Sequence, residues 1–279
     1  MVATKLASVT TLWNGVKMPW LGLGVWMARD GDEVKQAVKT ALQLGYRHID
    51  TAAAYGNEVG VGEAIRESGV PRAEIFVTTK VWNRDQGYES TLAAFDASLS
   101  RLGLEYVDLY LIHWAVPGKY MDTWRALETL YRDGKVRAIG VANFQPEHLE
   151  EVMSQGSVKP MVNQVELHPY HTQDRLWNFC REHNVQLEAW SPLFRGGELL
   201  KEPVLAEIGR KHGKSSAQVV LRWDLQREVV TIPKSVHGER IRENADLFDF
   251  ALTEEEMAWI SGLNQSRQAF DYDPYDVNF

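Results

Sequence analysis

Short apolar runs recur along the chain, and each is followed by a longer stretch with helical spacing of its apolar residues. Strand–helix units repeated eight times are typical of a closed parallel barrel rather than an open sheet. We therefore predict an α/β fold, a (β/α)8 TIM barrel. The strands are expected at Leu21–Gly24, Arg47–Asp50, Ile75–Lys80, Val107–Ile112, Val136–Val141, Met161–Glu166, Gln186–Trp190 and Val229–Ile232.

The segment before the first of these strands predicts a β-hairpin over about residues 8–19. Asn14-Gly15 lies between apolar residues and is typical of a two-residue turn, in which both residues need a positive φ. Such a hairpin would cap the bottom of the barrel. The alternative is a surface loop.

Several helix boundaries can also be predicted. Apolar residues lie on one face of 32–44, and Gly45 is a suitable C-cap. Pro146 marks a helix start, and Thr253 with Glu256 forms a capping box that opens a late helix. The stretch 209–215 is one residue short of a phosphate-binding loop, so we interpret it as the end of one helix and the start of the next.

No break in composition and no long linker divides the chain, so residues 1–279 are expected to form a single domain. The tail, at about 264–279, is too short and polar for another barrel unit, but it holds Phe270, Tyr272, Tyr275 and Phe279. A terminal tail can simply lie on the surface. We place this one near the mouth of the active site because aromatic side chains could cover a pocket.

Charge and composition exclude several classes of function. The net charge is 30 − 38 = −8, which argues against a nucleic-acid or anionic-membrane partner. No run approaches the ~18 apolar residues of a membrane-spanning helix, and the N-terminus has no apolar block. Cys180 is the single cysteine and has no partner for an internal disulfide, which favours a cytoplasmic protein. No cysteine–histidine pattern predicts a metal site.

Ionisable side chains stand at the ends of three successive predicted strands. Asp50 ends the second strand, Lys80 ends the third, and His113 follows the fourth, while Tyr55 lies just beyond Asp50. The carboxyl ends of barrel strands meet on the face that holds the chemistry of such barrels. A lysine at the end of an apolar strand is costly unless it is paired, and Asp50 is a natural counter-ion. Each residue also has an ordinary alternative: a surface turn, a core histidine, or a lysine that reaches the rim.

Together these four side chains could donate a proton to a carbonyl group. A free tyrosine has a pKa near ~10 and is a poor acid at neutral pH. Lys80 is expected to lower the pKa of Tyr55, and Asp50 to hold Lys80 in place. His113 could orient and polarise the carbonyl oxygen.

The chain resembles the aldo-keto reductase superfamily, in particular its bacterial diketogluconate reductase and methylglyoxal reductase type. The matching phrases follow the family order and lie at 22–26, 45–52 with Tyr55, 111–114, 140–144, 163–166 and 232–235. This resemblance implies a TIM barrel that binds NADPH without a Rossmann domain and reduces aldehydes or ketones. It carries the catalytic roles onto Asp50, Tyr55, Lys80 and His113. Consistent with this, the Gly-rich stretches 22–24 and 60–62 lack the third glycine of a Rossmann fingerprint.

The same resemblance implies where NADPH (NADP+) would bind. Asn143 and Gln164 would hold the nicotinamide carboxamide, and Trp190 would stack on the ring, where relatives often have tyrosine. The remaining implied contacts are Gly24 and Trp26, Ser191 and Leu193 along the diphosphate, Lys234, Ser235 and Arg240 at the 2′-phosphate, and Glu243 and Asn244 at the adenine.

The residues themselves are compatible with a phosphate at this place. Lys234 and Arg240 supply positive charge in an otherwise acidic protein. The alternative is a solvated basic start of a helix.

Ala142 departs from the family, which usually has serine before the asparagine of this motif. A lost neutral hydrogen bond is worth roughly 0.5–1.5 kcal/mol. We therefore expect weaker cofactor binding without loss of chemistry.

Trp26, Trp82 and Trp114, together with His113, are expected to wall a substrate pocket suited to uncharged or aromatic carbonyl compounds. By resemblance, the short segment 114–120 and the short tail indicate an open site with broad specificity. The prediction is an NADPH-dependent reductase of small or aromatic carbonyls that acts as a monomer. One alternative is an NADP(H)-binding sensor or regulatory subunit with little turnover. Another is an isomerase or aldolase with a Schiff base on Lys80, which Asp50 disfavours because it would keep the amine charged.

Overall fold

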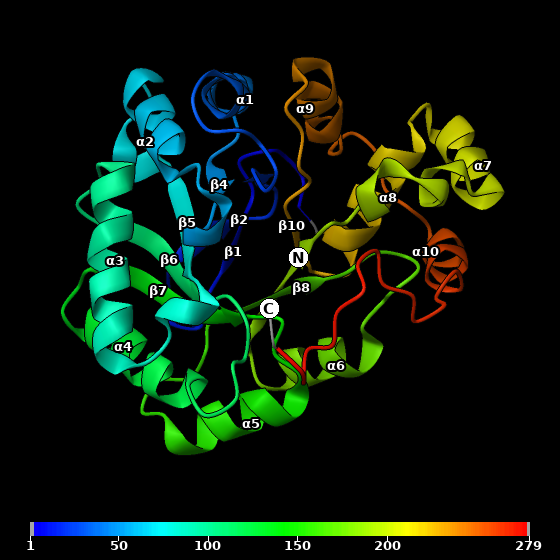
Figure 1. Cartoon of the computed structure of the whole chain (residues 1–279). Coiled ribbons are helices and arrows are strands. Elements are labelled where there is room, and N and C mark those ends of the chain that lie inside the picture. Colours follow the sequence, from blue (N-terminus) through cyan, green and yellow to red (C-terminus); the bar gives the residue numbers. More distant parts are fainter. Residues whose placement is uncertain (1–2, 278–279) are drawn as a thin grey trace.

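The computed structural model describes residues 3–277, and in it eight parallel strands form one sheet in chain order, from β3 to β10 (Figure 1). Parallel bridges between Leu21 and Thr231 and between Gly24 and Lys234 join the two outer strands, so the sheet closes into a barrel. The predicted (β/α)8 fold is confirmed, with strand bounds that differ by at most two residues. The strands are β3 (Leu23–Gly24), β4 (His48–Asp50), β5 (Phe76–Val81), β6 (Val107–Ile112), β7 (Val136–Ala142), β8 (Val162–Glu166), β9 (Gln186–Trp190) and β10 (Val230–Thr231).

Helices follow the strands and surround the barrel (Figure 1). The two largest fully buried side chains, Trp124 and Trp223, come from these helices, and Phe95 of α3 packs edge-on against Tyr110 of β6. The main core therefore lies between the sheet and the helical layer. The helices are α1 (Asp32–Leu44), α2 (Glu58–Glu67), α3 (Tyr88–Leu102), α4 (Tyr120–Arg132), α5 (Pro146–Gln155), α6 (Asp174–Glu182), α7 (Pro203–His212), α8 (Ser216–Gln226), α9 (Gly238–Ala245) and α10 (Glu254–Ser261).

The predicted helix boundaries are confirmed at the residues that carry the signals. Gly45 ends α1 with φ 102°, a left-handed conformation that glycine adopts without strain. Pro146 is the first residue of α5. Thr253 and Glu256 make the reciprocal capping bonds that open α10. The stretch 209–215 ends α7 and provides Ser215 as the N-cap of α8.

The predicted hairpin is present as β1 (Val9–Thr11) and β2 (Lys17–Pro19), but its turn is not the two-residue type. The Leu12 N–H donates to the Val16 carbonyl, the Gly15 N–H donates to the Leu12 carbonyl, and Gly15 has φ 90°. Asn14 is not in the positive-φ region. The prediction of two such residues was wrong because a three-residue loop needs a left-handed residue only at its last position.

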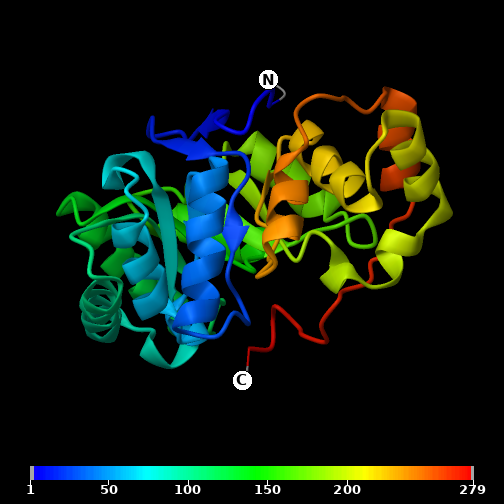
Figure 2. The same cartoon turned by 90° about the horizontal axis from the view of Figure 1, so that it is seen from above.

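The hairpin covers the end of the barrel at which the strands begin. Thr10 donates to Gln186 at the start of β9, and Asn14 donates to the carbonyl of Arg137 near the start of β7. The Trp13 indole donates to the carbonyl of Pro160, just before β8. Figure 2 shows the hairpin and the C-terminal tail on opposite sides of the molecule. The tail therefore lies on the side where the strands end.

Within residues 3–277, no helix is both long enough and apolar enough to cross a membrane.

Candidate active site

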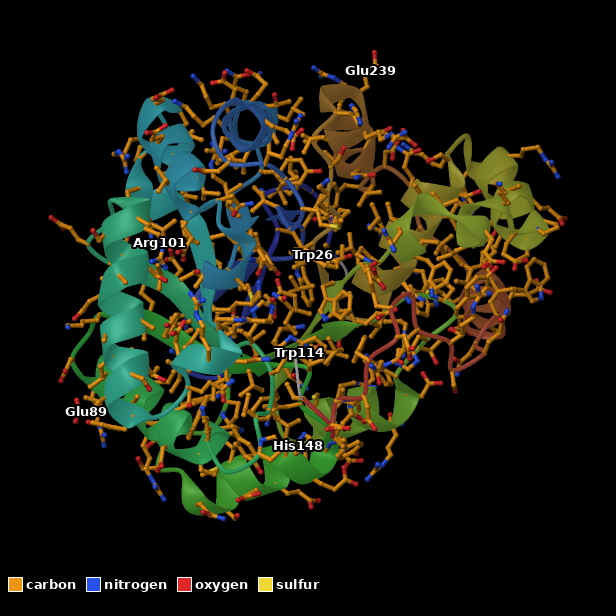
Figure 3. The ribbon with its side chains drawn as sticks, in the orientation of Figure 1. Trp26, Glu89, Arg101, Trp114, His148 and Glu239 are labelled. Carbon is orange, nitrogen blue, oxygen red and sulfur yellow. The ribbon has the colours of Figure 1, made fainter. Side chains whose placement is uncertain are left out.

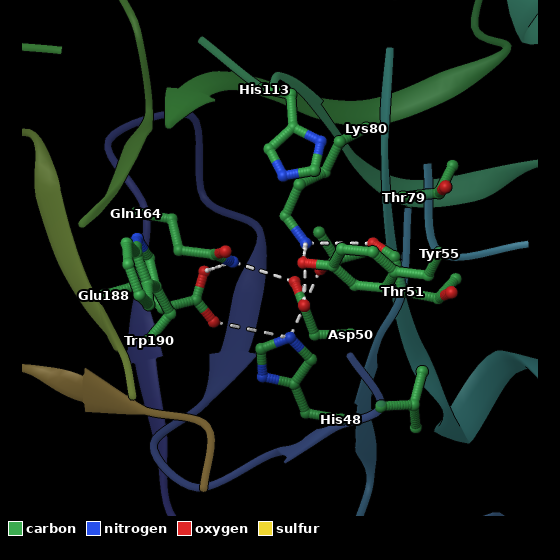
Figure 4. A network of polar contacts seen from close by, with 12 residues as sticks. His48, Asp50, Thr51, Tyr55, Thr79, Lys80, His113, Gln164, Glu188 and Trp190 are labelled. Atoms are coloured by element: carbon green, nitrogen blue, oxygen red, sulfur yellow. Dashed lines mark hydrogen bonds and ion pairs between the residues drawn. The ribbon is translucent and has the colours of Figure 1, made fainter. Parts of the chain in front are cut away.

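Lys80 is fully buried in β5 and lies at the centre of the polar groups inside the barrel (Figure 4). Its ammonium donates to Asp50 Oδ1 at 2.7 Å, to the Thr51 carbonyl oxygen at 2.9 Å and to the Tyr55 hydroxyl at 3.3 Å. The predicted Asp50–Lys80 ion pair is thus present. Because the Tyr55 oxygen accepts a hydrogen bond from Lys80, its own O–H proton is free to donate elsewhere.

The loop after β4 places Tyr55 beside Lys80. Tyr55 ends a short 3₁₀ turn, η1 (Ala53–Tyr55), and Gly56 leaves the turn with φ 67°. The next residue, Asn57, is fully buried and donates to the carbonyls of Val25 and Ala28, while it accepts from the Thr51 hydroxyl. These bonds hold both ends of the loop, so the phenol is fixed in position.

Burial and the Asp50–Lys80 ion pair shift the pKa values of these residues in opposite directions. Burial raises the pKa of Asp50, although the Lys80 ammonium opposes it. Burial alone would lower the pKa of Lys80, but Asp50, Tyr55 and Glu188 together raise it. Lys80 is therefore a protonated amine with three acceptors, which makes it a poor nucleophile for a Schiff base.

The pKa of Tyr55 corrects one expectation. Burial raises it above the ordinary value, and this effect outweighs the lowering by Lys80. Lys80 acts in the predicted direction, but burial outweighs it, so the pKa of Tyr55 is raised and not lowered. The sequence does not reveal how deeply the phenol is buried.

His113 follows β6 and is buried beside Tyr55. The two rings meet edge to face with centroids 5.7 Å apart, and the Trp82 ring packs on the imidazole at 5.1 Å. Burial and the Lys80 charge hold the pKa of His113 well below its usual range. The ring is therefore neutral at neutral pH, and it can act as a hydrogen-bond donor without adding a charge.

A cavity of about 1030 Å³ opens above these residues at the ends of the strands. Asp50, Tyr55 and His113 line it, and Lys80 lies beneath them. All other predicted site residues line the same cavity: Gly24, Trp26, Trp82, Trp114, Asn143, Gln164, Trp190, Ser191, Leu193, Lys234, Ser235, Arg240, Glu243 and Asn244.

Two amide side chains lie at the inner end of this cavity in fixed orientations. Asn143 follows β7 with φ 62° and donates to the His113 carbonyl oxygen at 3.0 Å, while its Oδ1 accepts from the Trp190 indole at 2.9 Å. Gln164 of β8 directs its Nε2 to Asp50 at 2.8 Å and to Glu188 at 2.9 Å. Its carbonyl oxygen is therefore the end that remains for a ligand. A carboxamide, which has both donors and an acceptor, fits such a pair of amides.

Lys234 and Arg240 also line the cavity, and both are exposed. In the described part of the chain neither forms an ion pair with a carboxylate, and the charge of Lys234 acts on Glu33 only as a weak influence that lowers its pKa. Two unpaired cations in an acidic protein suit an anion such as a phosphate. The cavity thus carries groups that fit both ends of a nicotinamide dinucleotide phosphate.

Aromatic rings from the strand ends and the tail surround the mouth of the cavity. Figure 3 shows Trp26 and Trp114 near the centre of the molecule, while Glu89 and Glu239 lie at its edge. Phe270 packs on Trp26 with centroids 5.0 Å apart, and Tyr272 packs on Trp114 at 4.9 Å. Both tail residues line the cavity, so its upper wall is largely apolar.

Sequence reasoning missed two buried residues below the cavity. Glu188 lies in β9 and His48 in β4, both are fully buried, and their side chains are 3.6 Å apart. The signal for Glu188 was available, because a carboxylate between Leu187 and Ala189 in an apolar strand needs a partner as Lys80 does.

A model of the aldo/keto reductase family matches residues 20–265. The chain belongs to this family. The resemblance seen in the sequence is thereby confirmed, as are the predictions of an oxidoreductase and of NADP(H) as its cofactor.

Relatives of this aldo/keto reductase match it over nearly its whole length. The glyoxal reductase of Bacillus subtilis is 59% identical over 265 residues, 95% of this chain and 96% of that protein. The 9,11-endoperoxide prostaglandin H2 reductase of Trypanosoma cruzi is 60% identical over 260 residues, 92% of both.

Solved structures agree with this relationship. An aldo-keto reductase from a Medee basin deep-sea metagenome superposes with a TM-score of 0.94 and 48% identity over 97% of this chain and all of that one. The aldo-keto reductase of Bombyx mori in complex with NADP superposes with a TM-score of 0.89 and 37% identity over 96% of both chains.

Proposed function

We propose that this aldo/keto reductase reduces small and aromatic aldehydes and ketones with broad specificity, and that Tyr55 delivers the proton to the carbonyl oxygen. One observation carries the proposal. The Tyr55 hydroxyl accepts from Lys80 at 3.3 Å and lines the cavity, so its proton is available to a carbonyl oxygen there. The cofactor is NADPH, which supplies the hydride to the carbonyl carbon when it is bound.

The ion pair makes proton donation by a phenol with a raised pKa feasible. As Tyr55 gives up its proton, the phenolate gains a negative charge next to the Lys80 ammonium. That attraction is strong inside a buried site because little water screens it. Asp50 keeps Lys80 in place and charged, and it contributes to the reaction only through Lys80.

His113 is proposed to orient the carbonyl group. A neutral imidazole can donate a hydrogen bond to the carbonyl oxygen without competing with Tyr55 for the proton. Its ring lies against Tyr55 and Trp82, which limits its rotation. The substrate oxygen would therefore lie between the imidazole and the phenol.

The residues around the cavity are proposed to hold the cofactor as the resemblance implies. Asn143 offers an N–H and Gln164 a carbonyl oxygen to the carboxamide, and Trp190 offers its ring. Lys234, Ser235 and Arg240 would bind the 2′-phosphate. The other predicted contacts are Gly24, Trp26, Ser191, Leu193, Glu243 and Asn244.

The substrate class follows from the walls of the cavity. Trp26, Trp82 and Trp114 present aromatic surface, and the lining holds one neutral histidine and one phenol at the reacting end. Similarity to a glyoxal reductase supports small carbonyl compounds as substrates. We further propose that the protein is cytoplasmic, as the single buried cysteine suggests, and that it acts as a monomer.

The decisive experiment follows NADPH consumption with methylglyoxal and with 4-nitrobenzaldehyde. Tyr55→Phe removes the proton donor but keeps the ring, so kcat should fall by at least ~100-fold, as for loss of a general acid. The dissociation constant for NADPH, measured by fluorescence, should stay within about twofold, since cofactor binding does not need the Tyr55 proton.

Tyr275→Phe is the matched control, because Tyr275 lies in the tail outside the cavity lining and bonds to Glu147. It should retain wild-type turnover. Full turnover in Tyr55→Phe would contradict the assignment of the proton donor. Tight NADPH binding by the wild type with no turnover on a wide panel of carbonyls would favour the sensor instead.

A further inference from the structure

Glu188 is a fully buried acid inside the barrel, one layer below the proposed catalytic residues. Its Oε2 accepts from Gln164 Nε2 at 2.9 Å, and the same nitrogen donates to Asp50 Oδ2 at 2.8 Å (Figure 4). One amide therefore bridges two carboxyl groups. The proposed function gives Glu188 no role, yet it shares a ligand-facing amide with the counter-ion of Lys80.

The charges around Glu188 do not balance if both acids are ionised. His48 and Asp50 on β4, Lys80 on β5 and Tyr55 on η1 are the titratable groups that face it. The three donors of Lys80 are already taken by Asp50, Thr51 and Tyr55. A buried carboxylate without a cation is very unfavourable, so Glu188 must hold a proton or share one with His48.

The position of that proton follows from the surroundings of both groups. Burial, followed by the nearby Asp50 charge, raises the pKa of Glu188 to about 8. Burial, followed by the Lys80 charge, lowers the pKa of His48 to about 3. His48 Nε2 also lies 3.2 Å from the Thr78 hydroxyl, a neutral partner. The proton therefore resides on Glu188.

We propose that Glu188 is a positioning residue whose carboxyl group is protonated at neutral pH, and that loss of this proton weakens Tyr55 as a proton donor. The second half of the proposal rests on the proposed function of Tyr55. Neutral Glu188 fixes the Gln164 amide while it leaves Asp50 as the anion that pairs with Lys80.

Ionised Glu188 changes the electrostatics of the site. A second negative charge below Asp50 raises the pKa of both Lys80 and Tyr55. A phenol with a higher pKa is a weaker acid toward a carbonyl oxygen. Carbonyl reduction should therefore decline as Glu188 ionises, in addition to any other alkaline effect.

The first test uses the ligand-free protein and needs no turnover. Infrared difference spectra across roughly pH 6 to 9 should show the carbonyl stretch of an un-ionised carboxylic acid that disappears as the pH rises. Glu188→Gln should lack this band. An ionised Glu188 at pH 7, with no such band in the wild type, would overturn the proposal.

The second test compares kcat/KM between Glu188→Gln and the wild type. The glutamine keeps the shape and the acceptor for Gln164 but cannot ionise, so the ratio of variant to wild type should rise by at least about threefold from pH 7 to pH 9. A residue that only supports packing would give the same ratio at both pH values, and that result would refute the link to Tyr55.

Asp224→Asn is the matched control. Asp224 is also fully buried, burial raises its pKa well above the usual range, and it bonds to Thr231 outside the cavity lining. The Asp224→Asn variant should lack the infrared band of Asp224 and should keep the wild-type pH dependence of kcat/KM. The same change of ratio in Asp224→Asn would count against a specific role of Glu188.

One further design covers a variant that does not fold, and the outcomes of the tests for Tyr55 and Glu188 remain distinguishable. If Glu188→Gln does not fold, wild-type protein labelled with carbon-13 glutamate gives a glutamic-acid band distinct from that of Asp224, and its titration decides the question. Undiminished turnover in Tyr55→Phe would refute the proposed function while the infrared titration still stood. Absence of the band would refute this inference while the collapse of Tyr55→Phe still stood.

Discussion

The Trp190 indole determines how Asn143 faces the cavity. Its N–H donates to Asn143 Oδ1 at 2.9 Å, and the amide nitrogen of Asn143 donates to the His113 carbonyl oxygen. The amide is thus held at both ends on a residue with φ 62°. The neighbouring Ala142 is buried and supplies no hydroxyl to this set. The indole therefore fixes the orientation of the one amide that the motif retains here.

Trp190→Phe keeps an aromatic ring but removes this donor, so NADPH should bind more weakly, by roughly two- to tenfold, as expected for one neutral hydrogen bond. Ala142→Ser should act in the opposite sense and tighten NADPH, by adding the hydroxyl that the family resemblance implies at this position. Isothermal titration with NADPH measures both effects.

Trp259→Phe is the control for the loss of an indole, because Trp259 is exposed on α10 and outside the cavity lining. Its dissociation constant should equal that of the wild type. An unchanged constant in Trp190→Phe would show that the indole bond is dispensable, and no gain from Ala142→Ser would refute the account of that position.

For single residues, the sequence predicted contacts better than it predicted pKa values. The Lys80–Asp50 pair could be predicted because a lysine in an apolar strand needs a counter-ion, whatever the details of the fold. The net pKa shift of Tyr55 could not be predicted, because it depends on how completely η1 and its neighbours exclude water. Glu188 in its apolar strand carried the same signal as Lys80, but its partner is the neutral Gln164 on the neighbouring strand, which no charge pattern indicates.

The C-terminal tail is the element that closes the aromatic mouth. Its backbone is held by bonds from Gln265 and Arg267 to the Tyr170 carbonyl and from Ala269 to Glu166. Beyond these anchors Phe270 contacts Trp26 and Trp190, with centroids 5.0 and 5.8 Å away. The tail thus adds a ring to the part of the cavity that the barrel leaves open.

Phe270→Ala should therefore discriminate between substrates by size. An aromatic contact is worth about 0.5–1.5 kcal/mol, so kcat/KM for 4-nitrobenzaldehyde should fall by roughly two- to tenfold. Methylglyoxal is too small to use this wall and should be turned over as before. Steady-state kinetics with both substrates measure the difference.

Tyr275→Ala provides the comparison within the same tail, since its side chain bonds to Glu147 rather than lining the cavity. It should leave both substrates unaffected. An equal loss for both substrates in Phe270→Ala would indicate a change in cofactor binding or folding instead of a substrate contact.

Elements with a local signal were predicted closely, and elements placed by distant contacts were not. The capping residues Gly45, Pro146 and Thr253 act within one turn, so their sequence context is sufficient. The prediction of the hairpin turn type was wrong because Asn-Gly is compatible with more than one loop length. The loop length depends on how Trp13 and Asn14 contact the barrel. The aromatic residues of the tail predicted its place near the mouth, but its path depends on Tyr170 and Glu166, which are far away in the sequence.

The whole molecule separates its charges into two environments. The exterior is acidic, with a net charge of −8 for the chain, and its ion pairs are mostly half-exposed. The barrel interior holds Asp50, Lys80, Glu188 and His48, all buried. Composition cannot distinguish these two sets. Of these two sets, the interior one makes the stability of the fold depend on pH near neutrality, because burial raises the pKa of Glu188 there.

Glu188 makes the fold less stable as the pH rises. Its pKa is about 8 in the folded protein against about 4.5 when exposed, so between these values the folded state binds one proton more than the unfolded state. Stability should then fall by about 1.4 kcal/mol per pH unit from this group. Glu188→Gln removes the effect, so the amount by which its free energy of unfolding in urea exceeds that of the wild type should grow from pH 6 to pH 7.5.

Glu67→Gln is the control. Lys35 and Lys39 lower the pKa of Glu67, which is ionised in both the folded and the unfolded state throughout this range. A constant difference between Glu188→Gln and the wild type would mean that Glu188 is already ionised in the folded protein.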